Sequence, residues 1–178
     1  VKQGKVRQIG LSNETPWGTM KYLELAETKS LPRVASIQNA YNLVNRGFEI
    51  GLSEVAMHEQ VGLLAYSPLA QGTLTGKYLG GQMPQGSRLA LFGDGPLMMR
   101  YKGDKTQQAI EMYVNLAKKY EIDPAQLAIQ FCNIQPFVTS TIIGATTMEQ
   151  LKTCIDSVGL DLTCLLYTSP SPRDSTLS

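Results

Sequence analysis

The sequence contains few cysteines and a single histidine, which limits the kinds of site that it can form. Its three cysteines, Cys132, Cys154 and Cys164, are odd in number and make no Cys-x-x-Cys pair, so they indicate neither a disulfide framework nor a zinc site. The histidine, His58, falls in an expected helix without a catalytic partner close in sequence, and histidine chemistry depends on such a partner. We therefore expect no metal site, no catalytic histidine, and a reducing compartment.

The sequence also lacks a bias of charge and a long apolar run. Sixteen Lys and Arg residues against fifteen Asp and Glu residues leave a formal net charge of +1, which gives no basic footprint for nucleic acid or for an anionic membrane. No segment approaches the roughly 20 apolar residues that span a bilayer, and no secretory leader is recognisable. Nucleic acid and membranes are thus not expected partners, and a cytoplasmic location is favoured.

What the chain does have is the balance of one globular domain, because 43% of its 178 residues are hydrophobic and 17% are charged. The segment from Cys164 to Ser178 breaks this pattern, since it has no periodicity and is crowded with Ser, Thr and Pro. Its run CLLYTSPSPRD closely resembles the translation of a sequencing-library adapter. We expect a partial domain over residues 1–163 and a disordered, non-native tail over residues 164–178.

Strand and helix patterns alternate along the domain. Short apolar strands are expected at Lys5–Leu11, Val34–Ile37, Leu63–Ala65 and Thr139–Ile143, with helical patterns between them. A strand, helix, strand order predicts right-handed βαβ units, in which the strands form a parallel sheet. The expected fold class is therefore α/β.

Helix starts are marked by capping residues. The expected starts or ranges are Thr15 followed by Pro16, Phe48–Gln60, Asp104, Asp123 followed by Pro124, and either Thr146 or Thr147. Ser, Thr and Asp side chains accept a hydrogen bond from the free N–H groups of a first turn, and Pro is tolerated there. Thr146 with Glu149 and Thr147 with Gln150 both fit the capping-box spacing, so both starts stay open.

The stretch from Gly62 to Tyr78 organises the rest of the chain. Its apolar strand ends abruptly in Tyr66, Ser67 and Pro68 and passes into a segment that carries Lys77. Ligands of parallel sheets bind at the carboxyl ends of the strands. The later segment Gly80–Tyr101 is rich in Gly, Pro and Met, and an irregular segment of that length is typical of a functional cover.

Polar residues follow every expected strand. Asn13 and Gln38 offer donors and acceptors to an amide group, and the Tyr66 ring offers a flat face to a heterocycle. The helix start after Gly144 offers free N–H groups to a phosphate, and Lys77 and Arg88 offer positive charges to other phosphate oxygens. Each residue alone is more often a turn former, a core residue or a solvated charge. Together they predict a site for a nicotinamide dinucleotide.

Four blocks of the chain resemble the aldo-keto reductase superfamily: GKVRQIGLSN, IQNAYN, LLAYSPLAQGTLTGKY and IIGATTMEQL. They stand in the family's order, extend over Lys5–Leu162, and are most similar to the bacterial branch that suppresses tyrosine auxotrophy, a relative of potassium-channel β-subunits. The resemblance implies a (β/α)₈ TIM barrel that reduces aldehydes or ketones with NADPH. Such a barrel typically needs about 250 residues, so this chain resembles its C-terminal half, strands 5 to 8 with their helices.

The resemblance also implies roles for single residues. Ser12, Asn13 and Gln38 would hold the nicotinamide carboxamide, and Tyr66 would stack on the nicotinamide ring. The residues implied around the pyrophosphate and ribose phosphates are Ser67, Pro68, Leu69, Ala70, Gln71, Lys77 and Arg88. Those implied at the adenosine end are Gly144, Thr146 and Gln150. Because the family often has a basic residue where Thr146 stands, preference for NADP would depend on Arg88 and the helix start.

The family's catalytic Asp, Tyr, Lys and His lie on its first four strands, so the resemblance places them before residue 1. We therefore expect no catalytic residue in this chain and no reductase turnover from it alone. A half barrel also leaves two sheet edges free, which favours self-association. Two alternatives stay open: a cofactor-sensing regulatory subunit like the channel β-subunits, and a truncated assembly product without function. The substrate and the oligomeric state are not predicted.

Overall fold

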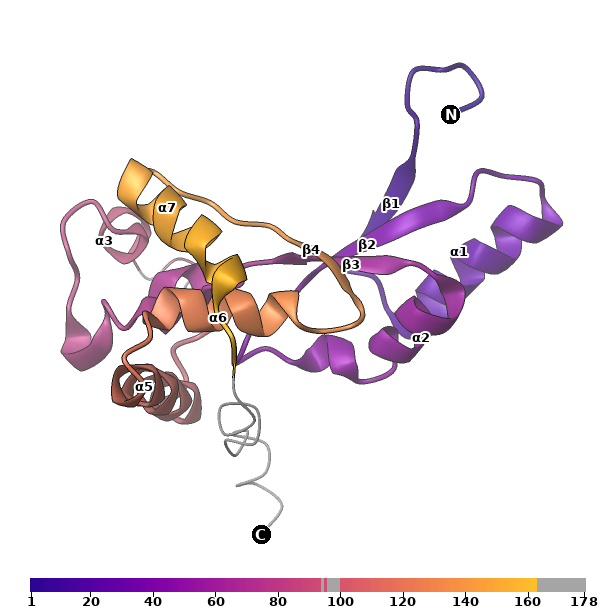
Figure 1. The fold of residues 1–178 in the computed structure, drawn as a ribbon. Helices are drawn as coiled ribbons and strands as arrows, with labels where there is room; N and C mark the ends of the chain where they lie inside the picture. The colour runs from indigo at the N-terminus through magenta and orange to yellow at the C-terminus, as the bar shows by residue number, and fades with distance from the viewer. Residues whose placement is uncertain (94, 96–99, 163–178) are drawn as a thin grey trace, which may run out of the picture.

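One parallel sheet of four strands lies at the centre of the computed structural model, which describes residues 1–93, 95 and 100–162 (Figure 1). The strands lie in chain order: β1 (Ile9–Ser12), β2 (Val34–Ala40), β3 (Gly62–Tyr66) and β4 (Val138–Thr141). All three pairs of neighbours are parallel. The α/β class and the parallel sheet predicted from the alternation are therefore confirmed, and four parallel strands are consistent with part of a barrel.

The strands begin and end at other residues than predicted, because a strand extends only as far as a neighbouring strand pairs with it. β1 begins at Ile9, not at Lys5, since Ile9 is the first residue with a partner on β2; the residues before it project away from the sheet (Figure 1). β2 continues past Ile37 to Ala40, which pairs with Tyr66. β4 spans Val138–Thr141 and stops short of the predicted end at Ile143.

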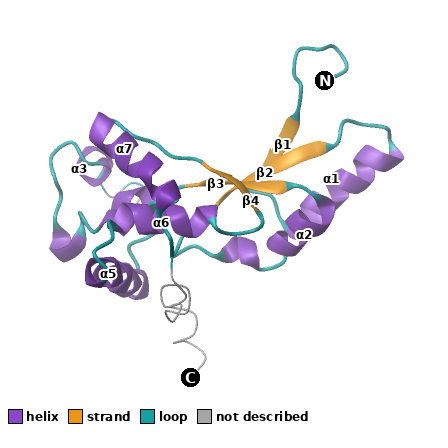
Figure 2. Cartoon of the chain, in the orientation of Figure 1, coloured by secondary structure: helices purple, strands orange, loops and turns teal. Residues whose placement is uncertain are grey.

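Helices cover one face of the sheet (Figure 2). Three of them contribute to the core beneath it: α1 (Pro16–Thr28), α2 (Leu52–Glu59) and α6 (Pro124–Asn133). Leu23, Ala56 and Cys132 from these helices pack with Ile37 and Leu63 from the strands. Each large apolar side chain buried in this way contributes about 1.5–3 kcal/mol. This layer holds the four strands in register.

The other face of the sheet carries a row of three polar side chains and one leucine. Ser12, Gln38, Leu64 and Ser140 are consecutive partners across the four strands. The first two and Ser140 are exposed, and Leu64 is half-buried. Parallel sheets are normally covered on both faces, whereas three of the four residues in this row are exposed.

A second core anchors the segment after β3. Helix α5 (Asp104–Lys119) and helix α6 pack against the 3₁₀ segment η2 (Ala70–Thr75). The buried contacts are made by Ala70, Leu74, Ile110, Val114 and Leu127. The turn that leaves the carboxyl end of β3 is therefore held from below by a packed layer.

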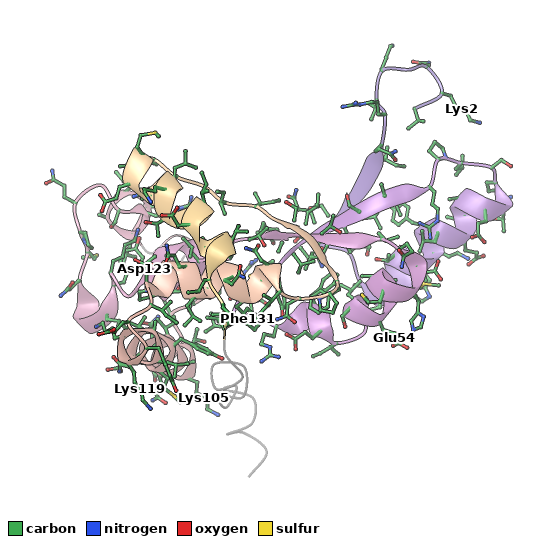
Figure 3. All side chains as sticks on the ribbon, viewed as in Figure 1. Lys2, Glu54, Lys105, Lys119, Asp123 and Phe131 are labelled. Carbon is green, nitrogen blue, oxygen red and sulfur yellow. The ribbon has the colours of Figure 1, made fainter. Side chains whose placement is uncertain are left out.

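Two predicted helix starts are confirmed at their capping residues. The Thr15 hydroxyl accepts a hydrogen bond from the Gly18 N–H at 3.1 Å. The Asp123 carboxylate accepts hydrogen bonds from the N–H groups of Ala125 and Gln126, at 2.7 and 3.2 Å, and begins α6 (Figure 3). Both contacts are local, which is why the sequence pattern predicts them.

The structure decides between the two open starts near the C-terminal end of the domain. Thr147 is the cap of α7 (Met148–Asp156), and its hydroxyl accepts from the Gln150 N–H at 3.2 Å. The Gln150 side chain in turn accepts from the Thr146 N–H at 2.9 Å. The start at Thr147 is therefore the one that forms.

Two other helix predictions are wrong in detail. The expected helix Phe48–Gln60 is divided into the 3₁₀ segment η1 (Gly47–Glu49) and α2, because Gly51 has a φ of 85°, which a right-handed helix excludes. Helix α5 is capped by Gly103, and Asp104 is its first residue.

The segment Gly80–Tyr101, predicted as irregular, contains part of the 3₁₀ segment η3 (Leu79–Gly81) and the short helix α3 (Arg88–Phe92). The predicted tail, residues 164–178, lies outside the described residues.

Candidate functional site

The carboxyl ends of the strands bring together residues that are far apart in the sequence. Ser12 and Gln38 are direct partners, and the Asn13 N–H donates to the Gln38 carbonyl at 3.0 Å. Ala40 lies opposite Tyr66, at the end of the next pair of strands. The structure thus places Ser12, Asn13, Gln38 and Tyr66 along one edge, here called the rim.

A side-chain contact closes this group. The Tyr66 hydroxyl donates to the Asn13 side-chain oxygen at 2.8 Å, although 53 positions separate the two residues. The Asn13 amide nitrogen makes a long contact of 3.4 Å with the Ser12 hydroxyl. Since a carboxamide both donates and accepts, Asn13 keeps hydrogen-bonding capacity for a ligand while its oxygen holds Tyr66 in place.

The backbone at the rim adopts an uncommon conformation. Asn13 and Ser67, which follow β1 and β3, have φ values of 53° and 55°, and Ala70 and Gln71 in the next turn have φ values of 47° and 61°. Non-glycine residues in the left-handed region cost free energy and persist where the surroundings enforce them, often at functional sites. The rim therefore shows local strain of the kind found at binding sites.

A buried asparagine enforces the conformation of Ser67. Asn42 is fully buried, and its amide nitrogen donates to the Ser67 carbonyl at 2.9 Å and to the Tyr101 hydroxyl at 3.1 Å. Its side-chain oxygen accepts from the Val44 N–H at 3.0 Å. A buried amide with all these partners is a rigid element. Asn42 thus fixes the turn after β3 to the chain that ends the 80–101 segment.

Arg100 lies near Tyr66. The Tyr66 hydroxyl, and after it the Tyr101 hydroxyl, favour the charged form of the guanidinium and raise the pKa of Arg100. Sequence reasoning missed Asn42, Arg100 and Tyr101. Asn42 lies within the block IQNAYN, and the Arg100–Tyr101 pair ends the long segment, but no spacing rule connects them to Tyr66.

The turn after Tyr66 carries an unpaired acceptor. The side-chain oxygen of Gln71 is buried, and no hydrogen-bond partner is found for it within the described part of the chain. Pro68 and Ala70 are buried beside it, and Leu69 is half-buried. A buried polar atom without a partner is costly. A donor group on a bound molecule, such as a ribose hydroxyl or an amide, would satisfy Gln71.

Lys77 lies against the same turn. A Cβ placed on Gly72 would lie 2.9 Å from the Cε atom of Lys77 and 3.1 Å from its Nζ atom, so the end of the Lys77 side chain lies close to the backbone of this turn. Glycine is favoured at position 72 because its φ is 94°. The same nitrogen lies 5.2 Å from the centroid of the Tyr78 ring. The ammonium group is therefore held beside the segment that follows Tyr66, where it can attract an anion.

The remaining predicted residues lie on two exposed elements. Arg88 is the first residue of α3 and is exposed. Gly144, Thr146 and Gln150 are exposed around the start of α7. The chain reaches α7 from the rim, because the Ile142 N–H donates to the Ala65 carbonyl at 2.8 Å. Within the described part of the chain, no hydrogen bond connects these four residues with Tyr66, so their grouping with the rim stays a prediction.

Other kinds of site find no support in the described residues. No group of three or more His, Cys, Asp or Glu side chains is placed to hold a metal ion in them. Burial raises the pKa of the Cys132 thiol to about 12, so this cysteine stays protonated. Among residues 1–93, 95 and 100–162, no helix has the length and apolar character needed to cross a bilayer.

Comparison with known proteins supports the resemblance carried by the four blocks. The profile of the Aldo/keto reductase family matches residues 1–164. The chain is 54% identical to Protein tas of Escherichia coli, over 96% of the chain and 51% of that protein. It is 42% identical to an aldo-keto reductase of Babesia bovis, over 84% of the chain and 54% of that protein.

A shorter match involves a protein of a different kind. Over 51% of its length the chain is 41% identical to a probable voltage-gated potassium channel subunit beta of Oryza sativa, and it covers 28% of that protein. The chain spans about half the length of the two curated relatives that it matches over most of its own length.

Proposed function

Because the chain belongs to the aldo/keto reductase family, we propose that it is the C-terminal, dinucleotide-binding part of an NADPH-dependent reductase of aldehydes or ketones. The single observation that carries the proposal is the 2.8 Å contact between Tyr66 and Asn13 on the same rim as Gln38. It gathers a flat ring and carboxamide partners, the groups that a nicotinamide requires.

The rim residues divide the work of holding such a cofactor. Ser12, Asn13 and Gln38 would bind the carboxamide, and the Tyr66 ring would support the nicotinamide, which supplies a hydride when bound. The buried oxygen of Gln71 and the ammonium group of Lys77 would hold the ribose and phosphate portion.

The exposed elements would hold the other end. The N-terminus of α7, with Gly144, Thr146 and Gln150, would receive the adenosine end, and Arg88 would bind its 2′-phosphate.

Titration of NADPH into the full chain tests the binding part of the proposal. We expect saturable binding that is weakened by Tyr66→Ala and unchanged by Tyr22→Ala, since Tyr22 is an exposed tyrosine on α1. Wild-type chain that does not bind NADPH would refute the proposal. Equal affinities for the Tyr66 and Tyr22 variants would refute the role given to Tyr66.

The second part of the proposal is that the isolated chain does not turn over substrate. General acid catalysis needs a positioned proton donor at the carbonyl oxygen, and the family's catalytic tetrad is expected on strands that precede this segment. The test follows the oxidation of NADPH by the 178-residue chain in the presence of an aromatic aldehyde. A rate above that of the buffer control would refute the claim.

A regulatory role is the second candidate, favoured by the 41% identity to a potassium channel subunit beta. In that role binding of the cofactor matters more than turnover. Capture of a membrane protein in a pull-down would favour it, whereas Tyr66, typical of the reductases, argues against it. The nucleotide sequence on both sides of the coding segment would separate either function from a truncated assembly product.

A further inference from the structure

Tyr101 is a buried residue to which the proposed function gives no role, and its position is fixed by packing and by two hydrogen bonds. Its ring is 2% exposed and belongs to the second core, with Leu74 and Ile110. Its carbonyl accepts a hydrogen bond from the Gln107 side chain at 2.5 Å, and its hydroxyl accepts one from the Asn42 amide at 3.1 Å. A side chain held in this way within a packed core is a rigid point of attachment.

The Asn42 amide makes these contacts in only one orientation. The Val44 N–H can only donate, and it bonds to the Asn42 side-chain oxygen at 3.0 Å. The amide nitrogen therefore lies on the other side, where it donates to the Ser67 carbonyl at 2.9 Å and to the Tyr101 hydroxyl at 3.1 Å. Loss of the Tyr101 hydroxyl would leave one amide hydrogen without this partner inside the protein.

The Ser67 carbonyl is the group that this amide holds, and Ser67 is the residue at which the chain turns away from Tyr66. Its φ of 55° lies in the left-handed region, which a non-glycine residue adopts at a cost in free energy. Such a conformation persists only where the surroundings enforce it, and the bond from Asn42 is a contact of that kind. The turn after Tyr66 therefore depends on the amide, and the amide depends on the Tyr101 hydroxyl.

We propose that Tyr101 is a positioning residue, which through Asn42 holds the turn after Tyr66 in the conformation that binds the nicotinamide half of a dinucleotide. The inference rests on the proposed function and extends it to a residue outside the four blocks. Tyr101 does not itself reach a ligand on the rim, because only 2% of its surface is exposed. It acts on the site through the hydrogen bonds of the Asn42 side chain.

The expected effect follows from the fraction of molecules whose turn is in the binding conformation, because the apparent affinity falls in proportion to that fraction. The strain at Ser67 and the net contribution of one hydrogen bond are of the same order, so losing the bond moves the equilibrium away from this conformation. Tyr101→Phe keeps the buried ring and removes only the hydroxyl. NADPH should then bind about 2- to 10-fold more weakly, the factor that corresponds to one hydrogen bond.

A ligand without the nicotinamide half should not respond to this change. 2′,5′-ADP carries the adenosine end alone, which the proposed function assigns to α7 and to Arg88 on α3. Helix α3 has an anchor of its own, because the Tyr78 hydroxyl accepts a hydrogen bond from the Leu89 N–H at 3.3 Å. Tyr101→Phe should therefore leave the affinity for 2′,5′-ADP unchanged.

Tyr41→Phe is the matched control. Tyr41 is also buried, and its hydroxyl donates to a carboxylate oxygen of Glu49, on η1, at 2.7 Å. Each of the two variants loses one hydrogen bond of a buried tyrosine, so both should unfold at a lower urea concentration than the wild type. Only Tyr101→Phe should weaken NADPH, whereas a purely structural loss would affect the two variants alike.

Calorimetric titration of NADPH and 2′,5′-ADP into the full chain compares the wild type with both variants. The inference is overturned by an unchanged affinity of Tyr101→Phe for NADPH, by an equal loss for the two ligands, or by an equal loss of NADPH affinity in Tyr41→Phe. A Tyr101→Phe chain that does not fold would also overturn it, because the hydroxyl would then support the whole fold and not the turn.

The proposed function fails separately. If the wild-type chain does not bind NADPH, both ideas are lost. If the wild-type chain binds NADPH and Tyr101→Phe binds it with the same affinity, the positioning role alone is wrong.

Discussion

Replacement of the buried Asn42 by alanine should destabilise the chain by about 3–5 kcal/mol. The substitution removes hydrogen bonds of 2.9 Å to the Ser67 carbonyl, 3.1 Å to the Tyr101 hydroxyl and 3.0 Å from the Val44 N–H. Each buried group left without a partner costs about 1–3 kcal/mol. The groups that lose a partner are the Ser67 carbonyl, the Val44 N–H and the Tyr101 hydroxyl.

Equilibrium unfolding in urea measures this loss, with Asn115→Ala as the control. Asn115 is an exposed asparagine within α5, where alanine is the better helix former, so its replacement should leave the free energy of unfolding unchanged within about 0.5 kcal/mol. A loss below about 1 kcal/mol for Asn42→Ala would refute the reasoning. It would mean that water or a shifted backbone satisfies Ser67 and Val44.

Three further predictions concern the sheet, a buried thiol and a helix start. Gly62→Ala should lower the free energy of unfolding by about 1–3 kcal/mol, because the added Cβ would lie 1.7 Å from the Oγ1 atom of Thr139. Adding Thr139→Ala should restore part of this loss. A Gly62→Ala variant as stable as the wild type would contradict the packing of β3 against β4. Burial raises the pKa of Cys132 from 9.0 to about 12, so the folded state holds this proton more tightly than the unfolded state. The thiol's contribution is fully present below pH 9.0 and is lost as the pH rises toward 12; Cys132→Ala should show a shallower loss of stability over that range, and parallel curves would rule the assignment out. Asp123→Ala should cost about 0.5–2 kcal/mol and raise hydrogen exchange in the first turn of α6, whereas unchanged exchange would show that this cap is dispensable.

Local features of the fold were predictable because they depend on neighbours in sequence. The caps at Thr15 and Asp123 bond to N–H groups two or three positions away. The alternation of patterns likewise predicted a parallel sheet, since short connections of this kind restrict the topology. The predicted β1 start at Lys5 failed for a different reason: a strand begins where a partner strand is available, and Ile9 is the first residue with one.

The same distinction applies to the candidate site. Residues that end a strand or directly follow it, such as Ser12, Asn13 and Tyr66, were predictable as a group because parallel strands end at one edge. Their cofactor-binding roles stay predictions. Asn42 and Tyr101 were not found, because Asn42 reaches Ser67 across 25 positions and Tyr101 across 59 positions.

The sequence by itself determined which residues could cap, turn or carry a polar group, and in what order the strands and helices follow each other. Those properties depend on side-chain chemistry and on contacts within a few positions. The tertiary structure alone decided that Asn42 connects the turn after Tyr66 with Tyr101, and where each strand begins. A hydrogen bond between distant residues forms only after packing has brought its two atoms within about 3 Å, and no local pattern encodes that distance.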